Sequence, residues 1–341
     1  MNGPSVPPLR FGILGAAKIA RGFTAGLRHS ERVKVLAVAS RDAAKARAFA
    51  REFAIDRCFG SYEAMLAEPD IDAVYVPLPN SLHAEWAIRA AEAGKHVLCE
   101  KPLSASASEA RAMFDAARRH GVHLAEAYPY RAQPQTLKLR ELLDSKVIGE
   151  PRLIQASFAF NLGAGKNIRW SAPLAGGALL DVGSYPVSLV RMIAGARPTS
   201  VQAAARWTQG GVDESVAATL EFESGLFAQI TCGFNAYLHR QALIAGTAGV
   251  IQTTFLNHTS SPSQAVLQLR TGTGGDAVDS VVQTSTADGF LAEAESFERL
   301  VRVGDAGWTG ASREESIDIA LTLEAILKSA RSGTAIAIPA G

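Results

Sequence analysis

A run of small residues near the start of the chain has the spacing of a phosphate-binding turn. Read against the pattern G-x-G-x-x-G, it is Gly15-x-Ala17-x-x-Ala20, so only the first glycine is kept. That glycine permits a tight turn, and the alanines let the backbone approach a pyrophosphate and the helix lie close to the strand. An ordinary strand–turn–helix is the alternative. Because the run follows the first expected strand, it favours a dinucleotide site made of Gly15, Ala16, Ala17, Lys18 and Ile19.

The end of the second expected strand should distinguish the two nicotinamide dinucleotides. An NAD site usually has Asp or Glu there, which binds the ribose 2′-hydroxyl. This chain has Ser40-Arg41-Asp42, and a hydroxyl beside a guanidinium suits a 2′-phosphate, with Lys45 placed to assist. Alternatively, Arg41 is a solvated surface charge and Asp42 binds the ribose or caps the next helix. We expect NADP(H), with NAD(H) as the alternative.

The composition is that of an ordinary globular protein. The 341 residues suggest about two domains, and 34 Lys+Arg against 33 Asp+Glu leave no basic field for a nucleic acid. Three distant cysteines without a CxxC pair argue against a disulfide framework and a zinc site, and no histidine spacing indicates a metal. Without a signal-like or membrane-spanning segment, we expect a cytoplasmic protein with no membrane partner.

The first part of the chain alternates expected strands with expected helices. The strands are 10–14, 33–40, 71–76, 96–99 and 122–125, and the helices are 18–28, 42–53, 82–93 (closed by Gly94) and 106–120. Such alternation is typical of a parallel α/β sheet. We expect residues 1–128 to form a Rossmann domain, a doubly wound parallel sheet that binds the dinucleotide.

Beyond residue 150 the pattern changes to that of an open, mainly antiparallel sheet. Expected strands are 152–160, 201–206, 215–222, 226–234, 241–245 and 265–269, with a hairpin turn at Glu223-Ser224-Gly225. Helices follow at 290–303 and 312–332, and Ser312 with Glu315 has the spacing of a capping box. We expect residues 129–341 to form an α+β substrate and dimerisation domain, whose helix 312–332 can pack back on the first domain.

Four segments in a fixed order carry a family pattern. They are Pro79-Asn80-x-x-His83, then Glu100-Lys101-Pro102, then Glu126-Ala127 with Arg131 and Pro134, and finally the run AGGALLDVGSY from Ala175 to Tyr185. Together they resemble the glucose–fructose oxidoreductase/inositol dehydrogenase/rhizopine-catabolism (Gfo/Idh/MocA) family over nearly the whole chain. The branch that looks most similar holds dimeric trans-dihydrodiol dehydrogenases, NADP-dependent D-xylose dehydrogenases and glucose–fructose oxidoreductases.

The resemblance implies roles for particular residues. The second sheet would form the floor of the site and the interface of a homodimer or higher homo-oligomer. Lys101, Asp181 and Tyr185 would be catalytic. Positions bordering the cofactor would be Pro77, Leu78, Asn80, His83, Glu100, Lys101 and Arg131. Substrate contacts are expected from Asn161, Arg169 and Trp170, although Trp170 could equally be a core or dimer-contact residue.

Hydride transfer at an alcohol carbon needs a group that handles the hydroxyl proton. Tyr185 is the preferred acid/base, and a phenol with a pKa of about 10 needs a nearby cation, which Lys101 would supply. Lys101 could instead transfer the proton itself. Asp181 and Tyr185 share a face of a regular helix, but Pro186 predicts a kink or a restart there. Asp181 could orient the substrate or bind backbone N–H groups.

These observations predict an NADP(H)-dependent oxidoreductase that acts on a carbinol or carbonyl carbon of a sugar, polyol or cyclic trans-diol. No Arg/Lys cluster accompanies the motifs of the second domain, so we expect a neutral polyol rather than a phosphorylated one. One alternative is a ketosugar or anhydrosugar reductase that consumes NADPH. Another is a cofactor-binding regulator without turnover, against which the presence of both Lys101 and Tyr185 argues.

Overall fold

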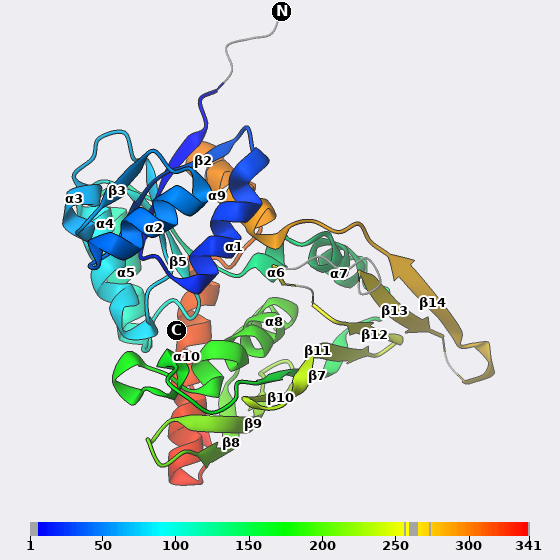
Figure 1. Ribbon diagram of the computed structural model, residues 1–341. Helices are drawn as coiled ribbons and strands as arrows, with labels where there is room; N and C mark the ends of the chain where they lie inside the picture. The colour runs from blue at the N-terminus through cyan, green and yellow to red at the C-terminus, as the bar shows by residue number, and fades with distance from the viewer. Residues whose placement is uncertain (1–5, 256, 259–264, 273, 340–341) are drawn as a thin grey trace, which may run out of the picture.

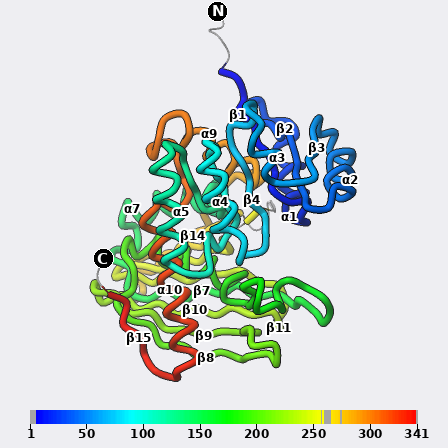
Figure 2. Tube along the Cα trace, turned by 90° about the vertical axis from the view of Figure 1, so that its left-hand side faces the viewer, coloured from blue at the N-terminus to red at the C-terminus, as the bar shows by residue number. Residues whose placement is uncertain are grey.

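The computed structural model describes residues 6–255, 257–258, 265–272 and 274–339. Two sheets dominate this part of the chain, and Figure 1 shows them one above the other, with helix α10 running down from the first domain along the second sheet. Residues 9–127 form the upper sheet and the helices between its strands. The turned view of Figure 2 shows the second sheet as a broad layer beneath the first domain. This is the expected pairing of a Rossmann domain with an α+β domain.

The first sheet has six parallel strands in the order β3-β2-β1-β4-β5-β6. They are β1 (Leu9–Leu14), β2 (Val33–Ala39), β3 (Arg57–Phe59), β4 (Ala73–Val76), β5 (His96–Glu100) and β6 (Leu124–Ala127). The helices between them are α1 (Lys18–Gly26), α2 (Ala43–Phe53), α3 (Tyr62–Leu66), α4 (His83–Glu92) and α5 (Ala107–Arg119). The strand order reverses between β1 and β4, which is the switch point where open α/β sheets bind ligands.

Helix α9 (Gly289–Val303) belongs to the second half of the sequence but packs with the first sheet. Phe297 contacts Phe11 of β1, and Phe290 contacts Phe23 of α1. Glu298 also forms an ion pair with Arg32. The chain therefore returns to the first domain after the expected boundary at residues 128 and 129, and α9 forms part of the core of that domain.

The second sheet has nine strands among the described residues, in the order β14-β13-β12-β11-β7-β10-β9-β8-β15. They are β7 (Pro151–Asn161), β8 (Ser200–Trp207), β9 (Asp213–Glu221), β10 (Phe227–Gly233), β11 (Asn235–Gly246), β12 (Gly249–Thr253), β13 (Val266–Thr271), β14 (Val278–Gln283) and β15 (Ile336–Ala337). Among the described strands of this sheet, β7 and β10 are the pair that runs in parallel. The expected turn at Glu223-Ser224-Gly225 joins β9 to β10, with Gly225 at a φ of 78°.

Four helices connect the domains or cover the inner face of this sheet. They are α6 (Pro129–Ala132), α7 (Pro134–Asp144), α8 (Ser184–Ala194) and α10 (Arg313–Ser332). Helix α10 begins with the expected capping box of Ser312 and Glu315. It contacts α5 of the first domain as well as α8 and β8 of the second, so it does pack back on the first domain.

The helix that carries Tyr185 is irregular, as Pro186 predicts. Residues Leu179–Gly183 form a π-helical turn, and α8 starts at Ser184 with Pro186 in its first turn. Proline has no N–H to donate to the preceding turn, which the change from a π-helical to an α-helical turn accommodates. Asp181 and Tyr185 consequently lie on either side of this change in helix type.

Candidate active site

The predicted cofactor residues gather at one edge of the first sheet. Because its strands are parallel, their carboxyl ends meet at the same edge. Gly15 follows β1, Ser40 follows β2, Pro77 follows β4 and Lys101 follows β5. Four separate segments of the sequence are thereby brought to the switch point.

The turn after β1 has the geometry that a pyrophosphate requires. Gly15 has a φ of 115°, and a Cβ there would lie 3.0 Å from Leu78 Cδ2. Helix α1 then begins at Lys18, and no side chain within the described ranges caps its first turn. Uncapped N–H groups at a helix N-terminus bind anions. The segment from Gly15 to Ile19 therefore fits the phosphates of a dinucleotide.

The residues after β2 include two exposed cations, Arg41 and Lys45, and a carboxylate, Asp42, that caps the next helix. Asp42 caps α2 by accepting hydrogen bonds from the N–H groups of Ala44 (2.9 Å) and Lys45 (3.2 Å), which is one of its two expected alternatives. Burial raises the pKa of Tyr62, and the charge of Arg41 counteracts this, so the guanidinium lies beside the Tyr62 hydroxyl. Lys45 is exposed nearby, and its Nζ lies 3.9 Å from the other carboxylate oxygen of Asp42. A 2′-phosphate would meet Ser40, Arg41 and Lys45 here.

His83 and Asn80 hold the loops around the switch point together. The ring nitrogens of His83 lie 2.9 Å from the Pro102 carbonyl oxygen and 2.8 Å from that of Leu78, so this fully buried ring bridges the segments after β5 and β4. Asn80 Nδ2 donates to the carbonyl oxygen of Ala175 (2.8 Å), in the second domain. Both side chains are thus engaged with backbone, which positions the cofactor edge against the second domain.

Lys101 lies where the two domains meet. Its Nζ donates to the carbonyl oxygen (2.7 Å) and to Oδ1 (3.0 Å) of Asp181, and it lies 5.0 Å from the centroid of the Tyr185 ring. Arg169 Nε donates to the other carboxylate oxygen of Asp181. Burial alone would raise the pKa of Asp181, but Lys101 and Arg169 hold it below its usual value. The carboxylate of Asp181 is therefore ionised, and it forms ion pairs with Lys101 and Arg169 beside Tyr185.

Tyr185 is buried, and its hydroxyl oxygen accepts a hydrogen bond from Asn257 Nδ2 (2.9 Å). The pKa of Tyr185 is raised well above the ordinary value for tyrosine, mainly by burial and secondly by the charge of Glu100. Glu100 is itself buried, accepts from the Tyr75 hydroxyl and from the N–H of Lys101 (3.2 Å), and has a pKa raised by burial. A phenol in these surroundings stays protonated at neutral pH.

Three predicted residues are engaged elsewhere. The guanidinium of Arg131 is buried between Glu315 (2.9 Å), Ser188 Oγ (3.1 Å) and the Ser188 carbonyl oxygen (2.9 Å), so its role is to tie α6 to α8 and α10. Asn161 Oδ1 accepts from the N–H of Gly163. Trp170, which is partly buried, packs edge-on against Phe234 and donates to the Gly163 carbonyl oxygen (3.2 Å).

The structure adds Asn257, His258 and Arg240, which the sequence did not single out. Asn257 contacts Tyr185, and its Nδ2 lies 3.1 Å from His258 Nδ1. Arg240 packs over the ring of Phe158, which contacts Tyr185. These residues lie in or just after strands of the second sheet, far in sequence from Asp181. No local motif marks them, because only the pairing of β11 with β7 brings Arg240 here.

Among the described residues, no group of three or more His, Cys, Asp or Glu side chains could hold a metal ion. None of the helices in the same part of the chain is long and apolar enough to span a membrane.

A parallel dinucleotide-binding sheet whose Lys101, after β5, meets Asp181 and Tyr185 of a second domain defines a nicotinamide-dependent oxidoreductase. The model of an oxidoreductase family with an NAD-binding Rossmann fold matches residues 9–128, and the GFO/IDH/MocA C-terminal domain matches residues 136–252. The chain belongs to the Gfo/Idh/MocA oxidoreductase family, and it is an enzyme of that family.

Named relatives cover most of the chain. D-xylose 1-dehydrogenase (NADP(+)) 2 of Haloferax volcanii is 38% identical over 334 residues, 96% of this chain and 99% of the relative. Trans-1,2-dihydrobenzene-1,2-diol dehydrogenase of Danio rerio is 40% identical over 72% of this chain and 74% of its own. The crystal structure of KijD10, a 3-ketoreductase from Actinomadura kijaniata in complex with NADP and TDP-benzene, is 32% identical, with a TM-score of 0.83 over 94% of this chain and 98% of that one.

Proposed function

We propose that this protein is an NADP(H)-dependent oxidoreductase that interconverts a carbinol and a carbonyl group of a sugar or a related diol. The observation that carries the proposal is the group formed by Lys101, Asp181 and Tyr185 beside the carboxyl edge of the first sheet. The relatives named as a D-xylose dehydrogenase and a dihydrodiol dehydrogenase support this class of substrate.

NADP(H) is the proposed cofactor because of the groups after β2. Arg41 and Lys45 are cationic and exposed, whereas Asp42 is used as a helix cap. The Haloferax relative and the 3-ketoreductase, both named with NADP, support the same choice. When bound, this cofactor supplies or accepts the hydride, and the residues of the chain orient the substrate and handle its proton.

Tyr185 is the proposed proton-transfer group. Its oxygen accepts a hydrogen bond from Asn257, so the phenolic hydrogen is free to be donated to a substrate oxygen. The raised pKa keeps that hydrogen in place at neutral pH, which suits carbonyl reduction. In the opposite direction the phenolate would accept the proton of the alcohol. The geometry therefore also supports the alternative of an NADPH-consuming ketosugar reductase.

Lys101 is proposed to stabilise negative charge on the substrate oxygen. It lies over the face of the Tyr185 ring and not at its hydroxyl, and its contacts are to Asp181. The cation whose charge counteracts the raised pKa of Tyr185 is Arg240. We therefore assign the electrostatic role to Lys101 and the proton to Tyr185.

The experiment that tests this assignment replaces each of two neighbouring buried tyrosines. Tyr185→Phe should lower kcat by about 10²- to 10⁴-fold, the usual contribution of a positioned acid/base. Tyr128→Phe is the matched control, because its ring centroid is 5.5 Å from that of Tyr185 and its hydroxyl donates to the Ser184 carbonyl oxygen instead. If both variants kept wild-type kcat, or lost it equally, Tyr185 would not be the proton-transfer group.

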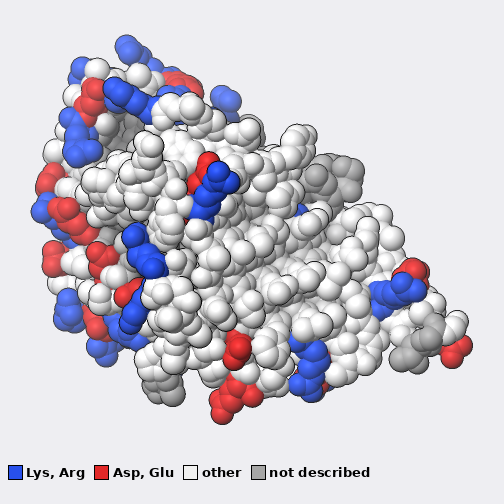
Figure 3. Space-filling model, turned by 90° about the horizontal axis from the view of Figure 1, so that it is seen from below, with Lys and Arg blue, Asp and Glu red and all other residues white. Residues whose placement is uncertain are grey.

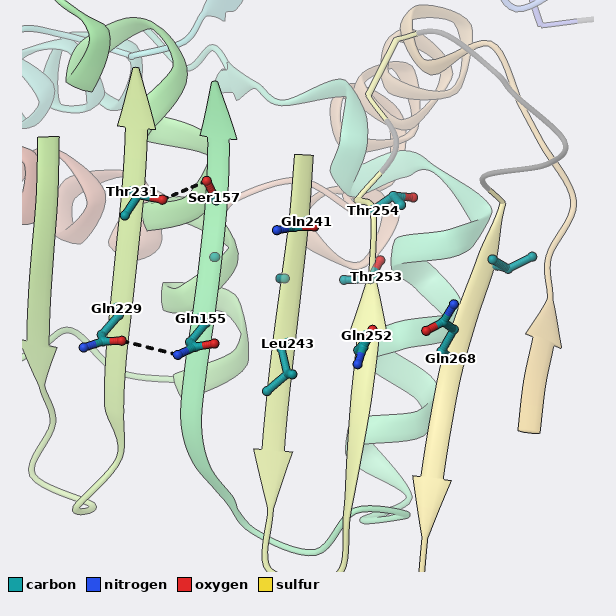
Figure 4. Close-up of a pocket in the computed structure, with 13 residues that line it drawn as sticks. Gln155, Ser157, Gln229, Thr231, Gln241, Leu243, Gln252, Thr253, Thr254 and Gln268 are labelled. Carbon is teal, nitrogen blue, oxygen red and sulfur yellow. Dashed lines mark hydrogen bonds between the residues drawn. The ribbon is translucent and has the colours of Figure 1, made fainter. Parts of the chain in front are cut away.

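A homodimer through the outer face of the second sheet is also proposed. Figure 3, seen from that side, shows a broad area with few charged side chains. A hollow across β10, β7, β11, β12 and β13 is lined by uncharged groups, as Figure 4 shows: Gln155, Ser157, Gln229, Thr231, Gln241, Gln252 and Gln268. Side-chain amides and hydroxyls can pair with a second copy without the cost of burying charge. A monomeric mass at micromolar concentration would contradict this proposal.

A further inference from the structure

Arg240 places a third cation beside the proposed reacting groups. It lies on β11 opposite Phe158 of β7, so both side chains are on the inner face of the sheet. Its guanidinium carbon is 5.5 Å from the centroid of the Phe158 ring, whose centroid is 5.2 Å from that of Tyr185. The side chain is partly exposed, so a bound molecule can reach it.

The charge of Arg240 is not matched by a carboxylate of the protein. Lys101 and Arg169 both pair with Asp181, whereas no Asp or Glu of the described residues lies within ion-pair distance of Arg240. The residues outside the described ranges include neither Asp nor Glu. Burial lowers the pKa of Arg240, as expected for a cation held away from water without a partner.

Other charged groups act on the same part of the site as Arg240. His258 has a pKa lowered by burial and then by the charges of Arg240 and Lys101, so these three residues face a common region. The carboxylates of this region are Asp181, Glu100 and Asp288, and among the described residues no ion pair joins any of them to Arg240. A bound anion would offset the cost of holding Arg240 there.

We propose that Arg240 binds an anionic group of the substrate, a carboxylate or a phosphate carried on the sugar away from the reacting carbon. This inference rests on the proposed function and specifies its substrate class. A guanidinium presents two parallel N–H groups to such an anion, which gives geometric selectivity as well as attraction. The sequence motifs alone predict a neutral polyol, because Arg240 lies far from them in the chain. The proposal of an anionic substrate takes the place of that prediction.

The test compares sugars that share a ring and differ in charge. D-glucose, D-glucuronate and D-glucose 6-phosphate are assayed with NADP⁺, and the same three members of the galacto series are added. The wild type should show kcat/KM roughly 10- to 100-fold higher for an anionic member than for the neutral sugar of its series, the effect of one charge-assisted hydrogen-bond pair. The uronate and phosphate arms distinguish the two kinds of anion.

Arg240→Gln should reduce that ratio to about one, mainly through KM, and Arg240→Lys should retain part of it. Arg270→Gln is the control, because Arg270 is an exposed residue of β13 that pairs with Asp279. Calorimetric titration of the NADP⁺-loaded protein with each anion gives a readout independent of turnover. The variants should bind NADPH as the wild type does, since Arg240 lies on the second sheet.

Each outcome decides the inference. Turnover of neutral sugars without a preference for the anionic ones would refute the role of Arg240 while leaving the proposed function intact. A preference that survives in Arg240→Gln, or an equal loss for both classes of sugar, would also refute it. If none of these six sugars were turned over, the titration would decide the inference separately from the proposed function, and equal anion binding by wild type and Arg240→Gln would refute it.

Discussion

Replacement of Lys101 by Met removes one charge and little volume from the centre of the site. The ammonium lies 5.0 Å from the centroid of the Tyr185 ring, and a substrate oxygen bound beside that ring would be at a comparable distance. A unit charge at this distance contributes about 3 kcal/mol at an effective dielectric constant of roughly 20. Because this attraction grows as negative charge develops on the oxygen, its loss lowers kcat by about 10²- to 10³-fold.

The affinity for the cofactor should change much less than kcat. Nζ of Lys101 binds Asp181 of the second domain, and the predicted phosphate turn lies after β1. We expect Lys101→Met to bind NADPH within about threefold of the wild type. The assay is the absorbance of the reduced nicotinamide for kcat, with quenching of protein fluorescence for the affinity.

Lys95→Met is the matched control for loss of a buried lysine. Lys95 precedes the other end of β5, is 7% exposed, and donates to the carbonyl oxygens of Glu68 (2.6 Å) and Ile71 (2.9 Å). It should lower the melting temperature and leave kcat near that of the wild type. The reasoning would be refuted if Lys101→Met kept kcat within tenfold, or if it lost NADPH affinity in proportion to kcat.

Three other predictions concern the cofactor, pH and assembly. Arg41→Ala should raise KM for NADP⁺ by roughly 10- to 100-fold and leave KM for NAD⁺ almost unchanged. The control is Arg47→Ala, which removes an exposed arginine of α2 and should leave both KM values unchanged. Equal effects of Arg41→Ala on both cofactors would refute the 2′-phosphate site. Burial raises the pKa of Glu126 in the folded protein from 4.5 to about 7. The contribution of this group to the free energy of unfolding is therefore complete below pH 4.5 and is lost as the pH rises through 7. Glu126→Gln should therefore gain up to about 3 kcal/mol in free energy of unfolding relative to wild type as the pH rises to about 8, measured by urea denaturation, and a constant difference would contradict this. Gln229→Glu should halve the mass measured by light scattering, because it places a charge on the outer face of the second sheet in both copies; an unchanged dimer would exclude that face.

Local patterns account for most of the fold. Periodicity located β1, β2, α4 and α5, and the capping residues Ser312 and Glu315 marked the start of α10. By contrast, β14 was missed because nearly all of its residues are exposed, so it has no alternation of apolar and polar side chains. The start of β11 was missed for a related reason, since Tyr237 and Leu238 are exposed where its register with β7 is irregular.

The order of the elements predicts which candidate residues meet where each lies at the end of a parallel strand, whereas Asp181 and Tyr185 were located by the family resemblance. Gly15, Ser40 and Lys101 follow parallel strands, so their meeting at one edge follows from the order of the elements. The buried pairing of Arg131 with Glu315 and the approach of Arg240 to Tyr185 depend on contacts between distant segments. Nothing in their local sequence specifies those contacts, because sheet register and helix docking are set by the packing of the whole domain.

The central claim is that this chain transfers hydride between NADP(H) and a sugar or diol. The most direct measurement follows the absorbance of the reduced nicotinamide while the protein is mixed with NADP⁺ or NAD⁺ and a panel of aldoses, inositols, uronates, sugar phosphates and trans-dihydrodiols. The predicted result is reduction of NADP⁺ by at least one class, faster than that of NAD⁺. Absence of reduction across the panel, together with absence of NADPH oxidation by the corresponding ketones and with cofactor binding shown separately, would contradict the claim.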